Sequence, residues 1–188
     1  MGSIPIHPRH VALRRKASYS VGVPHPLVEQ LQFTRAEWLR GLRGTPEEDG
    51  LRRLSPMNSI GWIVGHMAWH EQRYWLTRAQ DLTPYPVLNE VAASGGPATT
   101  PALGEMMTAW RKVTRSSDSW LDRVTDMSAA LPGSGPQRRI GDAIRRVTYH
   151  YWFHVGEIQA IRQMLGHTRL AQFVGDIDGR APYRPETQ

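Results

Sequence analysis

The 188-residue sequence contains no cysteine, which excludes disulfide bonds, thiolate metal sites and a cysteine nucleophile. Any chemistry at sulfur must therefore bring its thiol from outside the chain. Long apolar runs are also missing: none approaches the roughly 20 residues that span a bilayer, and the N-terminus lacks the apolar core of a signal peptide. These absences predict a soluble, cytoplasmic protein without a membrane partner.

Lysine is nearly absent as well. It occurs only at Lys16 and Lys112, although lysine and arginine together number 23 and the net charge is +6. Four of the positive charges lie near the start of the chain, at Arg9 and from Arg14 to Lys16, and the remainder is only mildly basic. We therefore expect no binding to nucleic acid.

Composition and length indicate one globular domain. Apolar residues make up 40% and charged residues 21% of the chain, and this length can bury one substantial core. Residues 1–26 contain prolines, histidines and the basic cluster without sustained periodicity, which predicts an extended basic N-terminal arm. Residues 27–188 are predicted to form a single domain, which ends in an extended C-terminal strap from about Phe173.

Helical periodicity recurs in four stretches: residues 27–42, 58–80, 100–124 and 142–165. Asn58 and Asp142 are the expected N-caps of the second and fourth helices, and the sequence from Thr45 to Glu48 has the capping-box pattern of a further short helical turn. A long connection containing proline and glycine precedes the third helix, as in functional lids and crossover connections. The pattern predicts an all-α fold, an antiparallel four-helix bundle with extended N- and C-terminal arms.

The residues most informative about chemistry are two pairs of histidines. His66 and His70 lie in the second predicted helix, and His150 and His154 lie in the fourth. Residues four apart on a helix share one face, with Cβ atoms about 5–6 Å apart, so both imidazoles of a pair can reach one ion. If the two helices face each other, they form a buried, histidine-rich metal site. Neutral imidazole suits Zn, Ni, Fe and Cu, and three histidines with one open position form a catalytic zinc site.

The spacing alone leaves the role of the upstream pair open. It does not choose between His66 and His70, and a histidine on this stripe can instead be a core residue or a surface partner of Glu71 or Arg73. The downstream pair differs from the metalloprotease motif, because Tyr151 stands where that motif has its glutamate base. Peptidase activity is therefore disfavoured.

Glu157 lies three residues beyond His154 on an adjacent edge of the same helix face. It can orient an imidazole, bind the metal or take a proton from bound water. It can equally form an ordinary ion pair with Arg73 or Arg162. The sequence leaves these alternatives open.

Two segments carry a family resemblance: SIGWIVGHMAW from Ser59, and HYWFHVGEIQAIRQMLGH from His150. Together, in this order and at this separation, they resemble the DinB-like (YfiT-like) metalloprotein superfamily over about residues 27–167. The resemblance implies a four-helix bundle in which one divalent metal ion is bound by a histidine of the second helix and two histidines of the last. By position these ligands are His66, His150 and His154, so the resemblance chooses His66 over His70.

The resemblance also implies a reaction. Members of the superfamily include metal-dependent S-transferases that use low-molecular-weight thiols such as mycothiol or bacillithiol, and hydrolases that detoxify reactive natural products. The leading hypothesis is therefore thiol transfer to a small electrophile, with a divalent Zn, Ni or Fe ion lowering the pKa of the thiol. In this hypothesis Arg73 and Arg162 receive carboxylates of the thiol cofactor or of the small-molecule substrate.

Two other hypotheses remain. In metal-dependent hydrolysis, the metal activates water and His70 or Glu157 handles the proton. In the third, the bundle is not catalytic: it keeps its histidines for packing, or it uses the basic arm to bind a partner or nucleic acid. Flat apolar helix faces and the many tryptophans also suggest a homodimer.

Overall fold

The structure is a computed structural model and describes residues 23–135 and 137–184. The regular secondary structure of these residues is entirely helical, with one isolated β-bridge between Ala130 and Arg139, which confirms the all-α prediction. Most of the predicted N-terminal arm, residues 1–22, lies outside the described residues. In the described part of the chain no helix is long and apolar enough to cross a membrane.

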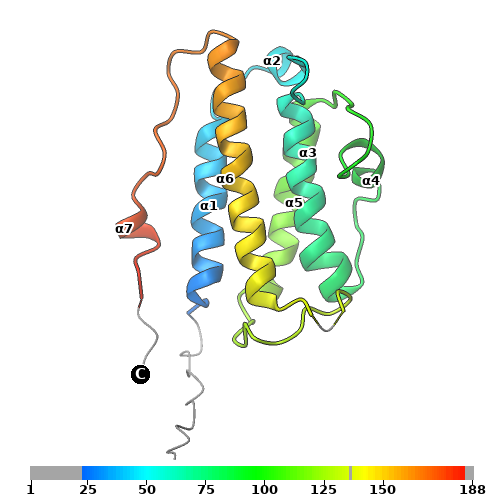
Figure 1. The fold of residues 1–188 in the computed structure, drawn as a ribbon, viewed down its shortest axis with the longest axis vertical. Coiled ribbons are helices and arrows are strands. Elements are labelled where there is room, and N and C mark those ends of the chain that lie inside the picture. Colours follow the sequence, from blue (N-terminus) through cyan, green and yellow to red (C-terminus); the bar gives the residue numbers. More distant parts are fainter. Residues whose placement is uncertain (1–22, 136, 185–188) are drawn as a thin grey trace, which may run out of the picture.

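Four long helical segments lie side by side (Figure 1). They are α1 (Pro26–Leu42), α3 (Ile60–Glu71) with its π-helical continuation η1 (Gln72–Arg78), α5 (Leu103–Leu121) and α6 (Ile140–Met164). Three short helices lie in the connections and in the C-terminal segment: α2 (Glu47–Leu51), α4 (Leu88–Val91) and α7 (Ile177–Arg180). The long helices bury one apolar core, whose largest fully buried side chains include Trp38, Trp75 and Tyr151.

The helix starts differ from the predicted caps by one to three residues. Ser59, not Asn58, caps α3, because its Oγ accepts a 3.1 Å hydrogen bond from the backbone N–H of Trp62. Asp142 lies in the first turn of α6, where its carboxylate interacts favourably with the positive end of the helix dipole. The short turn predicted after Thr45 is α2, which begins at Glu47 without a side-chain cap.

The sequence of helix directions differs from the predicted antiparallel order, because α1 and α6 run one way and α3 and α5 the other (Figure 1). The connection of residues 79–102 returns along the bundle (Figure 1), so α3 and α5 begin at the same end and run parallel. Their starts are in close contact: a Cβ on Gly61 would lie 2.2 Å from the carbonyl oxygen of Pro101, so only glycine allows this approach. The long connection is therefore the crossover that the sequence offered as one alternative.

The chain after α6 runs back along the bundle as the predicted C-terminal strap (Figure 1). The ring of Phe173 packs edge-on against Trp152, with 6.1 Å between the ring centroids, and fills the space left open by Gly41 of α1. The backbone N–H of Gly175 donates a 3.1 Å hydrogen bond to Glu37. These contacts fix the strap to α1 and α6.

Candidate metal centre

The structure brings the two histidine pairs together between α3 and α6. The ring centroid of His70 lies 4.3 Å from that of His150, and the ring of His66 lies 5.1 Å from His150 and 5.4 Å from His154. Within the pairs the centroids are 4.6 Å apart in both helices. The four imidazoles therefore form one cluster, which we call the histidine cluster.

Several nitrogens of the cluster are close enough to share one ion. One nitrogen each of His66, His70 and His150 lies within 4.8 Å of the other two, an arrangement that can hold a metal ion. Nε2 of His154 lies 2.9 Å from Nε2 of His150, somewhat shorter than the roughly 3.3 Å between two nitrogens of a tetrahedral zinc site with 2.0–2.1 Å bonds. His70, expected to be a catalytic residue, thus lies among the candidate ligands.

Hydrogen bonds fix the tautomers of two of the rings. Nδ1 of His66 lies 2.9 Å from the carbonyl oxygen of Ala92, and Nδ1 of His154 lies 2.7 Å from Oε2 of Glu157. Because these oxygens only accept, both Nδ1 atoms carry the hydrogen and each Nε2 keeps its lone pair. Metal-binding histidines in proteins have this arrangement, in which a carbonyl or carboxylate holds the second ring nitrogen.

A glycine allows the acceptor of His66 to come close. Ala92 follows α4 in the crossover connection. A Cβ on Gly65 would lie 3.0 Å from Cβ of Ala92 and 2.6 Å from Sδ of Met106, so a side chain there would displace Ala92 and force the Met106 side chain to move. Gly65 therefore leaves the space in which Ala92 approaches the neighbouring His66 and accepts its hydrogen bond.

His70 has an unsatisfied nitrogen. Its Nδ1 is buried and has no hydrogen-bond partner among the described residues. Its ring lies between Trp69, with centroids 4.8 Å apart, and Tyr74, which stacks on it at 6.0 Å. A buried polar atom without a partner costs about 1–3 kcal/mol. A metal ion or a bound ligand would supply the missing partner, which fits a site of imidazole donors.

Burial keeps three of the rings neutral. It is the main cause that lowers the pKa of His66 to about 4, of His150 to about 3 and of His70 to about 2, and neighbouring imidazoles contribute to each shift. The charge of Arg73 also lowers the pKa of His70. At neutral pH these rings are therefore uncharged, which is the form that binds metal.

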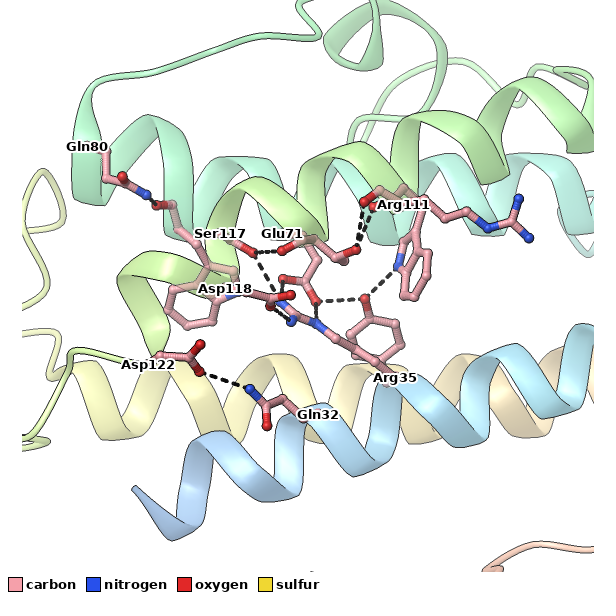
Figure 2. A network of polar contacts seen from close by, with 12 residues as sticks. Gln32, Arg35, Glu71, Gln80, Arg111, Ser117, Asp118 and Asp122 are labelled. Carbon is pink, nitrogen blue, oxygen red and sulfur yellow. Dashed lines mark hydrogen bonds and ion pairs between the residues drawn. The ribbon is translucent and has the colours of Figure 1, made fainter. Parts of the chain in front are cut away.

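A buried polar network connects the helices that carry the cluster to the rest of the bundle (Figure 2). Glu71 is fully buried, and its carboxylate accepts hydrogen bonds of 2.8 and 2.5 Å from Arg35 and one of 2.7 Å from the hydroxyl of Tyr151. Trp110 donates a 2.7 Å bond to the Tyr151 oxygen, and Arg35 also reaches Asp118 at 2.7 Å. The network thus joins α1, α3, α5 and α6.

The surroundings of this network keep the Arg35 guanidinium charged and the Tyr151 hydroxyl protonated. Burial lowers the pKa of Arg35, but the charge of Glu71 and the hydrogen bonds between them raise it above its ordinary value. Burial and the same carboxylate raise the pKa of Tyr151, so its hydroxyl stays a donor. The network was not predicted from the sequence, although Arg35, four residues after Leu31 and three before Trp38, lies on the apolar stripe of α1.

The two other predicted site residues differ in their placement. Arg73 lies over the ring of Trp69, 4.9 Å from its centroid, and therefore beside the histidine cluster. Arg162 is buried, with its guanidinium bonded to the carbonyl of Gly41 at 2.5 Å and to His167 at 2.9 Å. These contacts place Arg162 at the junction of α6 with α1, and none of them supports its predicted role in binding a ligand.

Comparison with known proteins agrees with these features. A family model described as the DinB superfamily matches residues 30–158, a range that covers more than half of the chain and includes all four histidines and Glu157. No curated protein matches the chain.

Proposed function

The chain belongs to the DinB superfamily, and from this premise we propose that it binds one divalent metal ion and transfers a low-molecular-weight thiol to a small electrophile. The thiol is of the mycothiol or bacillithiol type. The observation that carries the proposal is the convergence of four imidazoles from two helices, three of which burial keeps neutral.

We assign the metal to His66, His150 and His154. His66 and His154 are supported by their fixed tautomers, which leave Nε2 as the donor, and His150 by the short approach of its Nε2 to that of His154. Three imidazoles suit Zn, Ni or Fe. His70 is the fourth histidine of the cluster. We assign it to the open side of the metal ion, where the reacting group enters.

The donor set favours an anionic incoming ligand. All the donors are neutral, so both charges of a divalent ion remain uncompensated. When bound, the ion lowers the pKa of the group that takes its open position, a thiol in S-transfer or water in hydrolysis. Because the chain has no cysteine, the thiol comes from a cosubstrate.

The remaining residues orient the reaction. Nδ1 of His70 has no partner, so it can accept a hydrogen bond from the S–H of an incoming thiol. Glu157 holds the ring of His154 with Nε2 toward the cluster. Arg73, which lies beside Trp69, is assigned to receive a carboxylate of the thiol or the electrophile.

The same nitrogen of His70 favours metal-dependent hydrolysis as a second candidate. A water molecule that enters from the open side can donate to Nδ1 of His70 as readily as a thiol can. Hydrolysis needs no thiol, and its rate should rise with pH as the water loses its proton. These two properties separate it from thiol transfer.

The test is an activity assay on zinc-loaded protein with monobromobimane as the electrophile. Mycothiol and bacillithiol are supplied in separate reactions, the conjugate is quantified by mass spectrometry, and His66→Ala is the matched variant. We expect conjugation above the uncatalysed rate that the variant loses. Absence of conjugation with both thiols would exclude thiol transfer to this electrophile. Absence of stoichiometric metal, with no effect of His66→Ala on stability, would support a non-catalytic bundle.

A further inference from the structure

A cavity of about 450 Å³ lies beside the histidine cluster, within the size range of about 300–1,000 Å³ that is typical of small-molecule sites. Trp69, Arg73 and Arg78 form one wall, and the crossover connection contributes Thr83, Asn89 and Ser94 to the other. Trp69 is shared with the cluster, because its ring lies 5.8 Å from that of His66 and 4.8 Å from that of His70.

The charged side chains that line the cavity are all positive. Its lining includes two arginines and no acidic residue of the described chain. Neither Arg73 nor Arg78 forms an ion pair with any carboxylate in residues 23–135 and 137–184. A third arginine, Arg138, lies close by, since both it and Arg78 lie over the ring of Tyr74, at 5.7 and 5.1 Å from its centroid.

Arg78 is only partly satisfied within the described residues, where it contacts the ring and hydroxyl of Tyr74. Its Nη1 is buried without a hydrogen-bond partner among the described residues. Burial, and then the positive charges of Arg73 and Arg138, lower its pKa. A partly buried cation that has an unsatisfied nitrogen and lies among other cations is costly, and an anion in the cavity would lower that cost.

The π-helix explains how both arginines reach the same cavity. In an α-helix of 3.6 residues per turn, two residues five apart point about 140° away from each other. In η1 the wider turns, closed by hydrogen bonds between residues five apart, place Arg73 and Arg78 about one turn apart along one side. Such π-helical turns occur frequently at functional sites.

We propose that this cavity is an oxyanion subsite, in which Arg73 and Arg78 bind a carboxylate or phosphate group of a small organic anion. The inference rests on the proposed function for the identity of this anion, which is the thiol or electrophile whose reactive end meets the histidine cluster across Trp69. Arg78 was not among the expected site residues. The substrates of the protein therefore belong to the class of small molecules that carry a negative charge.

The experiment measures binding of two probe anions, succinate and sulfate, to the full chain by isothermal titration calorimetry. It is run on metal-free and on zinc-loaded protein. We expect the wild type to bind at least one probe in both forms, and Arg73→Gln and Arg78→Gln each to weaken binding about tenfold or more. The tighter probe tells whether the subsite prefers a planar carboxylate or a tetrahedral anion.

The controls separate a specific site from general charge. Arg123→Gln removes an exposed arginine that does not line the cavity, and it should leave probe binding unchanged. Arg78→Lys keeps the charge and loses the planar fork, so its affinity should lie between those of the wild type and Arg78→Gln. If either glutamine variant fails to fold, the other carries the test.

The outcomes also distinguish this inference from the proposed function. If wild-type protein binds neither probe, or if Arg123→Gln weakens binding as much as Arg73→Gln does, the subsite is refuted even where zinc binding and thiol conjugation hold. If probe binding depends on the two arginines but the protein holds no zinc and conjugates no thiol, the subsite stands and the proposed function fails. Zinc content should be the same in the wild type and both glutamine variants.

Discussion

The hydroxyl of Tyr151 donates a 2.7 Å hydrogen bond to Oε1 of Glu71, and each of these residues directly follows a histidine of the cluster. Glu71 follows His70 on α3, and Tyr151 follows His150 on α6. A bond between these neighbours fixes the position of α3 along α6 at the level where the imidazoles meet. The buried network therefore positions the candidate ligands as well as stabilising the core.

The first prediction concerns the stability that this network provides. Glu71→Gln leaves the buried Arg35 with only the half-exposed Asp118 as a charge partner, so it should lower the free energy of unfolding by about 3–5 kcal/mol. Tyr151→Phe removes one hydrogen bond to a charged group and should lower it by about 1.5–3 kcal/mol. Urea unfolding of the metal-free variants measures both values.

Asp118→Asn is the matched control for these variants. Asp118 also bonds Arg35, but its side chain is 44% exposed, so its loss should lower the free energy of unfolding by only about 0–1 kcal/mol. An equal loss for Asp118→Asn and Glu71→Gln would show that burial of the network does not matter.

The second prediction separates the two possible ligand sets. We expect the wild type to hold one zinc ion per chain, His154→Ala to lose stoichiometric zinc, and His70→Ala to retain it with weaker affinity. The reason is that His154 has a carboxylate holding its Nδ1, whereas Nδ1 of His70 has no partner. Elemental analysis after dialysis gives the stoichiometry. The reverse result would assign the ion to His66, His70 and His150.

The third prediction concerns the carboxylate behind His154. Glu157→Gln keeps the size of the side chain but removes the charge that supports the ring, so zinc affinity should fall about 10–100-fold. Competition with a chromophoric chelator measures the affinity. Glu105→Gln, on the exposed side of α5, is the control and should leave it unchanged. Unaltered affinity in Glu157→Gln would remove Glu157 from the site.

The fourth prediction concerns the pH dependence of stability without metal. Burial holds the pKa of His66, His150 and His70 at about 4, 3 and 2 in the folded protein, whereas an unfolded histidine titrates near about 6.5. Between these values the unfolded chain binds more protons, so stability rises with pH. The contribution is complete above about pH 6.5 and is lost as the pH falls toward the folded values.

Thermal unfolding of metal-free protein between pH 8 and pH 4 measures this effect. The melting temperature should fall with pH below about 6.5, and His70→Asn should show a shallower fall because one depressed group is gone. An identical fall in both proteins would mean that His70 is not held neutral in the folded state.

The long helices and the two histidine pairs could be predicted because their signals are local. Apolar residues at helical spacing mark all four long segments, and a four-residue separation places two imidazoles on one helix face wherever the helix lies. The meeting of the pairs required only that α3 and α6 face each other. The family resemblance then supplied a reason to expect this meeting.

The features that could not be predicted depend on distant parts of the chain. Arg35 and Glu71 are 36 positions apart, and nothing near either residue indicates its partner. The π-helical turns of η1 follow no residue pattern recognised in the sequence. The parallel course of α3 and α5 depends on the route of the crossover connection, which helical periodicity does not report.

The crossover connection has one more consequence, for the evolution and engineering of this chain. Surface loops usually tolerate insertions and deletions, because their length has little effect on the elements they join. Here the carbonyl of Ala92 sets which nitrogen of His66 is free, so the length of the connection is coupled to the chemistry of the ring. A one-residue insertion just before Ala92 would change metal affinity while leaving every ligand in place, and this connection is the wrong place to graft a foreign loop.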